Sequence, residues 1–310
     1  MINKLRYESL SAELSSLESL VSDADKYSDP VGRLQLSYKI EKIKEEMALY
    51  KDESHKAGVA LFFSGNPVLG SRGINTDFTG AILKEFQDIV SKVNANLTIG
   101  EIGSRGRVPN SSSSNLMITN ISKGSFGFIL EELNEQEEAV DTTLKMVMDQ
   151  VINYITGIGS INEDEFDTIL EKLDGRTLLS IKDFFVTLDH NGALLRLVEG
   201  SNDYSLDKSY IHRARLRSES IEIKEEEPIY TGRVIGILPK HRKFEMILEG
   251  DIPIYGSLDY SALKQLDEFT QNDESVLNEI WKVKMHVRNV KPLNHTEKKF
   301  YSLIGFIEKK

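Results

Sequence analysis

The sequence predicts an α+β protein built from an N-terminal antiparallel helical hairpin, a mixed α/β middle domain and a small five-stranded OB-like β-barrel at the C-terminus. Three observations predict it. Heptad-like apolar seams occupy residues 1–52, short apolar strands alternate with amphipathic helices over 53–225, and residues 226–310 have the β-β-β-α-β-β order of an OB-fold. We therefore expect three domains with these bounds, the last two separated by an acidic run that ends at Pro228.

Two narrow apolar seams predict the hairpin. Leucine and valine recur every three to four residues over 10–21, and a similar series runs over 36–50. Between them Asp29 and Pro30 form a helix start, with Asp29 as the N-cap and Pro30 in the first helical position. Because such a hairpin buries little by itself, we expect it to pack on the body of the protein or on another copy.

The middle domain combines short strands with amphipathic helices. We expect strands at 58–63, 115–121, 125–131 and 193–199, and helices from about 76 and over 135–156, 162–173 and 177–191. Asn162, with Glu165 three residues later, has the pattern of a capping box. Residues 207–218 fit either a basic helix or a strand.

Five strands and one helix predict the barrel. The expected strands are 229–238, 244–249, 252–258, 280–290 and 299–307, and a short helix follows Asp259 as its N-cap. Over 280–290 apolar and polar residues alternate, which predicts a half-buried strand with Trp281 on its apolar face.

Basic residues gather in the two loops, 239–243 and 291–299, that would flank the binding face of such a barrel. The candidate nucleic-acid contacts are Lys240, Arg242, Lys243, Lys291, Lys298 and Lys299. Beside Tyr255, Trp281 and Tyr301 these cations could follow a phosphate backbone while the rings stack on bases. The alternative is a barrel that docks other proteins, because hairpin loops are polar in any barrel.

The composition excludes several kinds of site. The 310 residues include no cysteine, which excludes disulfides, thiolate nucleophiles and cysteine-based metal sites. No two of the six histidines stand three or four residues apart, so a helical histidine pair for a metal is excluded, and we expect no metal and no cofactor. The charged start, MINKLRYESL, does not fit a signal peptide, and no apolar run reaches the length of a membrane span. We therefore expect a cytoplasmic protein with no membrane partner.

The net charge of −11 is concentrated in one segment. Residues 131–174 contain thirteen acidic residues and two lysines, which accounts for the whole net charge of the chain. Such a segment is typical of a solvated helical face. The alternatives are a docking face for a basic partner and a shield against non-specific binding of nucleic acid.

A glycine-rich turn between a strand and a helix resembles the layout of a phosphate-binding loop. Ser71 stands where that motif needs a lysine and Arg72 where it needs a magnesium-binding hydroxyl, which excludes a standard nucleotide hydrolase. A simpler anion site at Gly70, Ser71 and Arg72 remains, and because Gly-Ser-Arg-Gly recurs at 103–106, we expect Arg105 to join it. Alternatively the glycines only make turns.

One catalytic pattern remains. Glu222 and Lys224 form a Glu-x-Lys pair on an expected strand, with Asp203 or Asp207 upstream, as in magnesium-dependent nucleases. Glu-x-Lys is common in charged sequence, so the pattern is weak. Asp189 could serve nucleotide hydrolysis only if it followed a strand, as the acidic residue of a Walker-B motif does. The apolar residues before it have helical spacing, which excludes this interpretation.

Together these features favour a non-catalytic binding and assembly protein over an enzyme. We expect a homo-oligomer that joins other protein subunits in a larger bacterial complex, such as a defence system, and whose barrel contacts single-stranded nucleic acid. The alternatives are a magnesium-dependent nuclease and a protein that senses anions or nucleotides through its glycine-rich loops.

Overall fold

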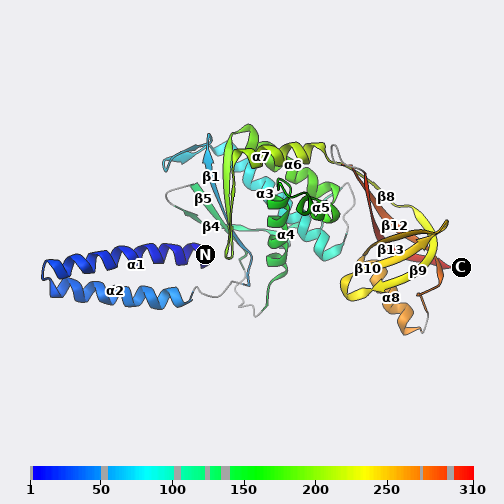
Figure 1. Ribbon diagram of the computed structural model, residues 1–310, viewed down its shortest axis with the longest axis horizontal. Helices are drawn as coiled ribbons and strands as arrows, with labels where there is room; N and C mark the ends of the chain where they lie inside the picture. The colour runs from blue at the N-terminus through cyan, green and yellow to red at the C-terminus, as the bar shows by residue number, and fades with distance from the viewer. Residues whose placement is uncertain are drawn as a thin grey trace. The chain divides into compact units, whose positions relative to one another are not determined.

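The chain is an α+β protein with a small closed five-stranded barrel at its C-terminus, as the sequence predicts (Figure 1). The computed structural model describes residues 3–49, 55–100, 106–122, 126–133, 140–272, 275–291 and 297–310. Two compact units are present. The first consists of 1–81, 114–150 and 188–208, and the second of 82–113, 151–187 and 209–310.

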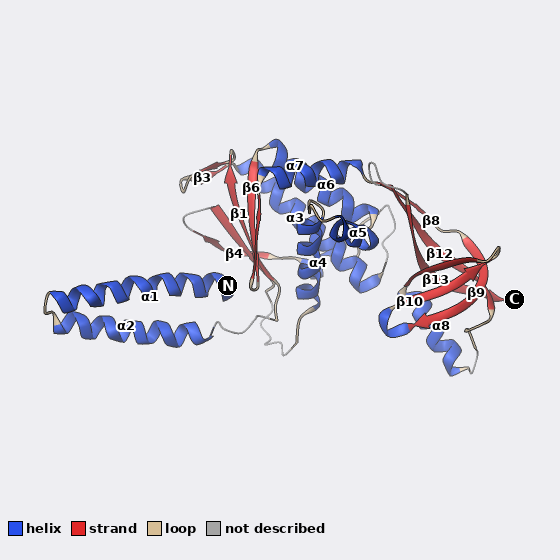
Figure 2. Cartoon of the chain, in the orientation of Figure 1, coloured by secondary structure: helices blue, strands red, loops and turns tan. Residues whose placement is uncertain are grey.

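Helices α1 (Asn3–Lys26) and α2 (Pro30–Leu49) form the hairpin at the N-terminus of the first unit (Figure 2). Asp29 caps α2, since its carboxylate accepts a hydrogen bond from the amide of Gly32, 2.9 Å away. The two apolar seams meet inside the hairpin. Leu10, Leu17 and Ile43 are buried there, and Leu14, Leu36, Ile40 and Met47 pack against them. The two apolar seams therefore pack against each other within one chain.

An antiparallel sheet with the order β4-β5-β1-β6-β7 forms the core of the first unit. Its strands are β1 (Gly58–Gly65), β4 (Met117–Ser122), β5 (Phe126–Glu131), β6 (Ala193–Glu199) and β7 (Asn202–Leu206). Sequence periodicity predicts four of the five. It misses β7 because this edge strand, NDYSL, has too few apolar residues to alternate.

The first turn of α1 rests on one face of this sheet. Leu5 packs there against a small buried cluster. The cluster consists of Ala60, Phe62, Ile129 and Val198. A Cβ atom at Gly127 would overlap the ring of Phe62, so the face is closely packed at this point.

The remaining helices differ little from those expected. They are α3 (Thr76–Ile99), α4 (Thr143–Gly157), α5 (Glu163–Lys172), α6 (Gly175–His190) and α7 (Lys208–Ser220), with a 3-10 turn at Ser111–Ser114. Helix α4 is preceded by the non-helical residues 140–142, and the hydroxyl of Thr142 caps it by accepting from the amide of Lys145 (3.1 Å), whereas the start expected at residue 135 lies outside the described residues. The ambiguous segment 207–218 is helical from Lys208 onward. None of the helices in the described part of the chain has the length and apolar content needed to cross a lipid bilayer.

Helix α7 holds the loop between α4 and α5 in the second unit. Tyr210 is half-buried, and its hydroxyl donates to the carbonyl oxygen of Ile155 (2.8 Å) and accepts from the amide of Gly159 (3.1 Å). The guanidinium of Arg213 donates to the carbonyl oxygen of Gly159 (2.6 Å). Burial raises the pKa of Tyr210 well above its ordinary value, so this hydroxyl stays protonated.

Five strands close into the barrel. They are β9 (Ile229–Leu238), β10 (Lys243–Leu248), β11 (Ile252–Leu258), β12 (Ile280–Lys291) and β13 (Lys298–Lys309). Around the barrel the order is β9-β10-β11-β13-β12 and back to β9, with β11 and β13 parallel. A sixth strand, β8 (Glu222–Glu226), pairs with β12 outside the closed ring.

The barrel encloses its own core. Helix α8 (Tyr260–Gln271) begins after Asp259, whose carboxylate accepts from the amide of Ser261 (2.9 Å), as expected for its N-cap. Its buried residues join those of the strands in one cluster with Trp281. Closure needs a residue without a side chain, because a Cβ atom at Gly256 would overlap the carbonyl oxygen of Tyr301 on the parallel strand β13.

Candidate functional site

The loop between β9 and β10 has a defined shape. A 3-10 turn, Pro239–His241, fills it, and Arg242 follows with a left-handed φ of 50°, which is uncommon for a residue other than glycine. The amide of Arg242 donates to Pro239 (3.1 Å), and the carbonyl oxygen of Arg242 accepts from the amide of Leu258 (2.9 Å). Lys240 and Arg242 are both exposed. The backbone therefore holds two cationic residues beside the end of β11.

An exposed aromatic residue lies on the neighbouring strand. Tyr255 of β11 is 77% exposed and pairs in register with Glu245 of β10. Along the strand it lies three residues from Leu258, or about 10 Å from the point where the loop is held. A tyrosine in this position offers a flat surface on which a base can stack. Glu245 adds one negative charge beside it.

Of the three aromatic residues expected near the loops, Tyr255 is the exposed one. Trp281 is 3% exposed, and its ring centroid lies 5.1 Å from that of Phe269 and 5.3 Å from that of Phe306. Tyr301 is half-buried against Tyr230, at 6.3 Å. Trp281 thus belongs to the core, as the alternation along its strand predicts.

The second loop lies between β12 and β13. Lys291 at the end of β12 and Lys299 at the start of β13 are both exposed. Asn289 pairs with Lys299 and Val290 with Lys298, so these cations share one end of the β12–β13 ladder. The residues between the strands, 292–296, lie outside those that the structure describes.

Helix α5 supplies carboxylates to the other two loop cations. Lys243 pairs with Glu171 at 3.2 Å, and Lys298 pairs with Asp167 at 2.5 Å. Asp167 and Glu171 stand four residues apart and therefore lie on one face of the helix. These four side chains remain between 35% and 50% exposed. Part of the acidic segment 131–174 therefore neutralises cations of the barrel instead of facing only solvent.

Arg288 of β12 makes a contact that sequence reasoning does not reveal. Its side chain is buried, and its guanidinium donates to the carbonyl oxygens of Leu173 (2.5 Å) and Glu171 (2.7 Å). These oxygens belong to the end of α5, where carbonyl groups lack intrahelical partners and a cation is favoured by the helix dipole. In the sequence Arg288 is one of four polar residues alternating along a strand, and nothing distinguishes it from the others.

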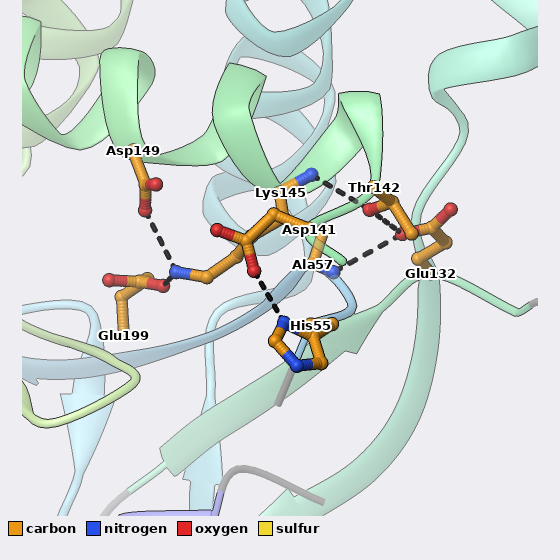
Figure 3. Close-up of polar contacts among 8 residues, drawn as sticks. All are labelled: His55, Ala57, Glu132, Asp141, Thr142, Lys145, Asp149 and Glu199. Carbon is orange, nitrogen blue, oxygen red and sulfur yellow. Dashed lines mark hydrogen bonds and ion pairs between the residues drawn. The ribbon is translucent and has the colours of Figure 1, made fainter. Parts of the chain in front are cut away.

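A separate polar cluster lies in the first unit, where α4 meets the ends of β5 and β6 (Figure 3). The buried ammonium of Lys145 pairs with the buried Glu199 and with Asp149, 2.8 Å away. Burial alone would lower the pKa of Lys145, but hydrogen bonds with both carboxylates hold it above its ordinary value. This ammonium stays charged at neutral pH and cannot act there as a general base or nucleophile.

The rest of this cluster fixes the start of α4 (Figure 3). The carboxylate of Glu132 accepts from the hydroxyl of Thr142 (2.7 Å) and from the amide of Ala57 (3.2 Å). His55 and Asp141 form a separate pair at 2.7 Å. Within the described residues, no group of three or more His, Asp or Glu side chains could hold a metal ion. These contacts join secondary-structure elements of the first unit.

Lys92 and Ser180 form a pair that could in principle activate a serine nucleophile. Burial lowers the pKa of Lys92, and its ammonium donates to the hydroxyl of Ser180. A lysine of lowered pKa beside a serine is a pattern of serine nucleophiles. Ser180, however, is buried in the middle of α6, where backbone amides are bonded within the helix and cannot stabilise an oxyanion. The pair therefore ties α3 to α6.

The glycine-rich segment after β1 contains a small hairpin. Strands β2 (Val68–Leu69) and β3 (Gly73–Ile74) pair, with Leu69 opposite Gly73. The tip consists of Gly70, Ser71 and Arg72. Gly70 has a φ of 54°, which explains the glycine at this position without any ligand.

The start of α3 has its own cap. The side chain of Asn75 accepts from the amide of Phe78 at 2.9 Å and so uses one of the amides that an anion would need. Arg72 is exposed at the hairpin tip, and Arg105 lies outside the described residues. The expected joint anion site therefore stays a prediction.

The nuclease pattern is spread over three elements. Glu222 and Lys224 are exposed on the edge strand β8, and Asp207 directly precedes α7. Asp203 of β7 accepts two hydrogen bonds from Arg196, at 2.9 and 2.6 Å, which hold the pKa of its carboxyl below the ordinary value. The nuclease interpretation also stays a prediction.

No protein-family model, no curated protein and no solved structure matches this chain.

Proposed function

We propose that this chain is a non-catalytic binding and assembly protein of the bacterial cytoplasm, and that its barrel contacts single-stranded nucleic acid. The observation that carries the proposal is the loop that ends at Arg242. Its fixed backbone carries Lys240 and Arg242 at the end of β11, the strand that also carries the exposed Tyr255. OB-folds bind single strands with cations that follow the backbone and aromatic rings that stack on bases.

The expected contact does not depend on base sequence. Lysine and arginine pair with phosphates that every nucleotide has, and Tyr255 offers a face on which any base can stack. The net charge of −11 opposes the approach of an anionic ligand, so we expect modest affinity and a strong dependence on salt.

The assembly part of the proposal rests on the hairpin. Its internal seam is filled, but the opposite side of α2 carries three exposed apolar residues at helical spacing. They are Val31, Leu34 and Tyr38. Residues 8–25 of α1 carry five acids and no base, while residues 33–44 of α2 carry four bases and one acid. A second copy therefore suits this surface, because α1 of one chain and α2 of another have complementary charge.

The direct test measures binding of a fluorescent oligo-dT of about 15 nucleotides to the full chain by anisotropy, at low salt. Lys240→Glu combined with Arg242→Asn should weaken binding at least tenfold, because two phosphate contacts are lost. Asparagine is chosen at position 242 because it tolerates the left-handed backbone.

Lys264→Glu is the control. Lys264 is exposed on α8, so this change lowers the net charge by two units, against three for the loop variant, and lies outside the two loops. It should reduce affinity much less. If Lys264→Glu weakened binding as much as the loop variant, the contact would be general attraction and not a site at the loop.

A further inference from the structure

We infer that helix α5 acts as an intramolecular competitor for the nucleic-acid site, with its carboxylates in the places that phosphates would take on the barrel. This inference rests on the proposed function and concerns its regulation. Asp167 and Glu171 pair with Lys298 and Lys243. Those two lysines begin β13 and β10, the strands that follow the two loops of the expected binding face.

The geometry of α5 suits this role. Asp167 and Glu171 are one helical turn apart, so one rigid element presents two negative charges on the same face. Each contacts a different loop region of the barrel. A single strand that followed both loops would meet the same two lysines with successive phosphates.

Contacts other than the two ion pairs hold α5 and the chain that follows it in place. Arg288 donates to the carbonyl oxygens of Glu171 and Leu173 from a buried position, and its guanidinium lies 5.7 Å from the ring of Phe300. The carboxylate of Glu225 on β8 accepts from the amide of Gly175, 3.1 Å away. The position of the helix therefore does not depend on the two exposed ion pairs.

The ion pairs themselves are replaceable. All four side chains are between 35% and 50% exposed, and ion pairs of this kind contribute little to stability because water screens them. A phosphate of a bound strand can thus displace either carboxylate while α5 stays packed against the barrel. The acidic helix therefore lowers the affinity of the barrel for a single strand. Lys240 and Arg242, which lie outside these ion pairs, are left as the first contacts for phosphates.

The inference predicts a specific change in salt dependence. In the parent protein Lys243 and Lys298 are already paired with protein carboxylates, so they displace few of the cations condensed on the phosphates of the strand. In Asp167→Asn/Glu171→Gln both lysines can pair with phosphates instead, and each such contact releases cations from the strand. The slope of log affinity against log salt should steepen by about 0.7 per freed lysine, or about 1.4 in all.

The experiment compares the full-length parent with Asp167→Asn/Glu171→Gln, using oligo-dT anisotropy from low to moderate salt. At low salt we expect roughly three- to thirtyfold tighter binding for the variant. The matched control is Asp164→Asn/Glu165→Gln, which changes the net charge equally in the first turn of the same helix. It should leave both affinity and slope close to those of the parent.

The outcomes separate the inference from the proposed function. Binding by the parent with an unchanged affinity and slope in Asp167→Asn/Glu171→Gln would overturn the inference and leave the binding function in place. An equal gain in the control would overturn it too, because net charge alone would explain the effect. If neither parent nor variant bound at low salt, the proposed function would fail together with its regulation. Equal circular dichroism spectra of all variants would show that each is folded.

Discussion

The guanidinium of Arg288 lies 2.5 Å from the carbonyl oxygen of Leu173, and this hydrogen bond joins β12 of the barrel to the chain just after α5. Both partners are buried, so neither can replace the other with water. A strand residue 115 positions further along the chain thereby donates a hydrogen bond to a carbonyl oxygen at the end of a helix.

Arg288→Met should destabilise the second unit. The substitution leaves the carbonyl oxygens of Glu171 and Leu173 without this donor, which we expect to cost about 1.5–3 kcal/mol of unfolding free energy. Urea denaturation measures it. Lys299→Met is the control, since Lys299 is exposed on β13, and its unfolding free energy should change by less than about 0.5 kcal/mol. Equal effects of both substitutions would contradict the role given to Arg288.

Gly256→Ala should prevent tight closure of the barrel. The new Cβ atom would overlap the carbonyl oxygen of Tyr301, which is backbone and cannot rotate away. Trp281 is the only tryptophan and is buried in the barrel core, so its fluorescence reports on this unit. We expect red-shifted emission and an earlier unfolding midpoint. Gly236→Ala meets only ordinary contacts and should leave both unchanged.

Lys145→Met should strongly destabilise the first unit, by about 3 kcal/mol, because it leaves Glu199 charged and buried without a partner. The pKa of Lys145 is higher in the folded than in the unfolded chain, so its contribution is complete below the unfolded value of about 10.4 and is lost as the pH rises through the folded value. The difference between parent and variant should therefore stay constant from about pH 6 to 9 and shrink above pH 10.5. A difference that grew at alkaline pH would contradict this assignment.

Leu34→Lys combined with Tyr38→Lys should lower the native mass of the protein in light scattering. Both residues are exposed on the side of α2 that faces away from α1, where we place the second copy. Ile161→Lys, at another exposed apolar residue, should leave the mass unchanged. A parent protein that is monomeric at tens of micromolar would refute assembly through the hairpin.

Local signals in the sequence predicted most elements of the fold. Strands β6, β9 and β11 have the expected bounds, and Asp29, Asn162 and Asp259 cap helices as predicted. The capping box at Asn162 is altered, because the carboxylate of Glu165 accepts from the hydroxyl of Ser160. Periodicity and capping act within a few residues, so they can be read without the tertiary structure.

The partners of the charged residues could not be predicted in the same way. Alternation along β12 shows which face Arg288 lies on but not that α5 ends beside it. Similarly, the basic loops were visible, but the pairing of Lys243 and Lys298 with α5 joins segments more than 70 residues apart. Such contacts depend on how elements pack, which hydrophobic periodicity does not encode.

Contact between the loop cations and phosphates should make oligo-dT binding by the full chain depend strongly on salt. Four exposed loop cations, Lys240, Arg242, Lys291 and Lys299, should give a slope of log affinity against log salt of about −3, at about −0.7 per phosphate contact. We expect this slope, together with broadening of the NMR signals of the Tyr255 ring when oligo-dT binds. No binding at 20 mM salt, or binding with a slope near zero, would contradict it.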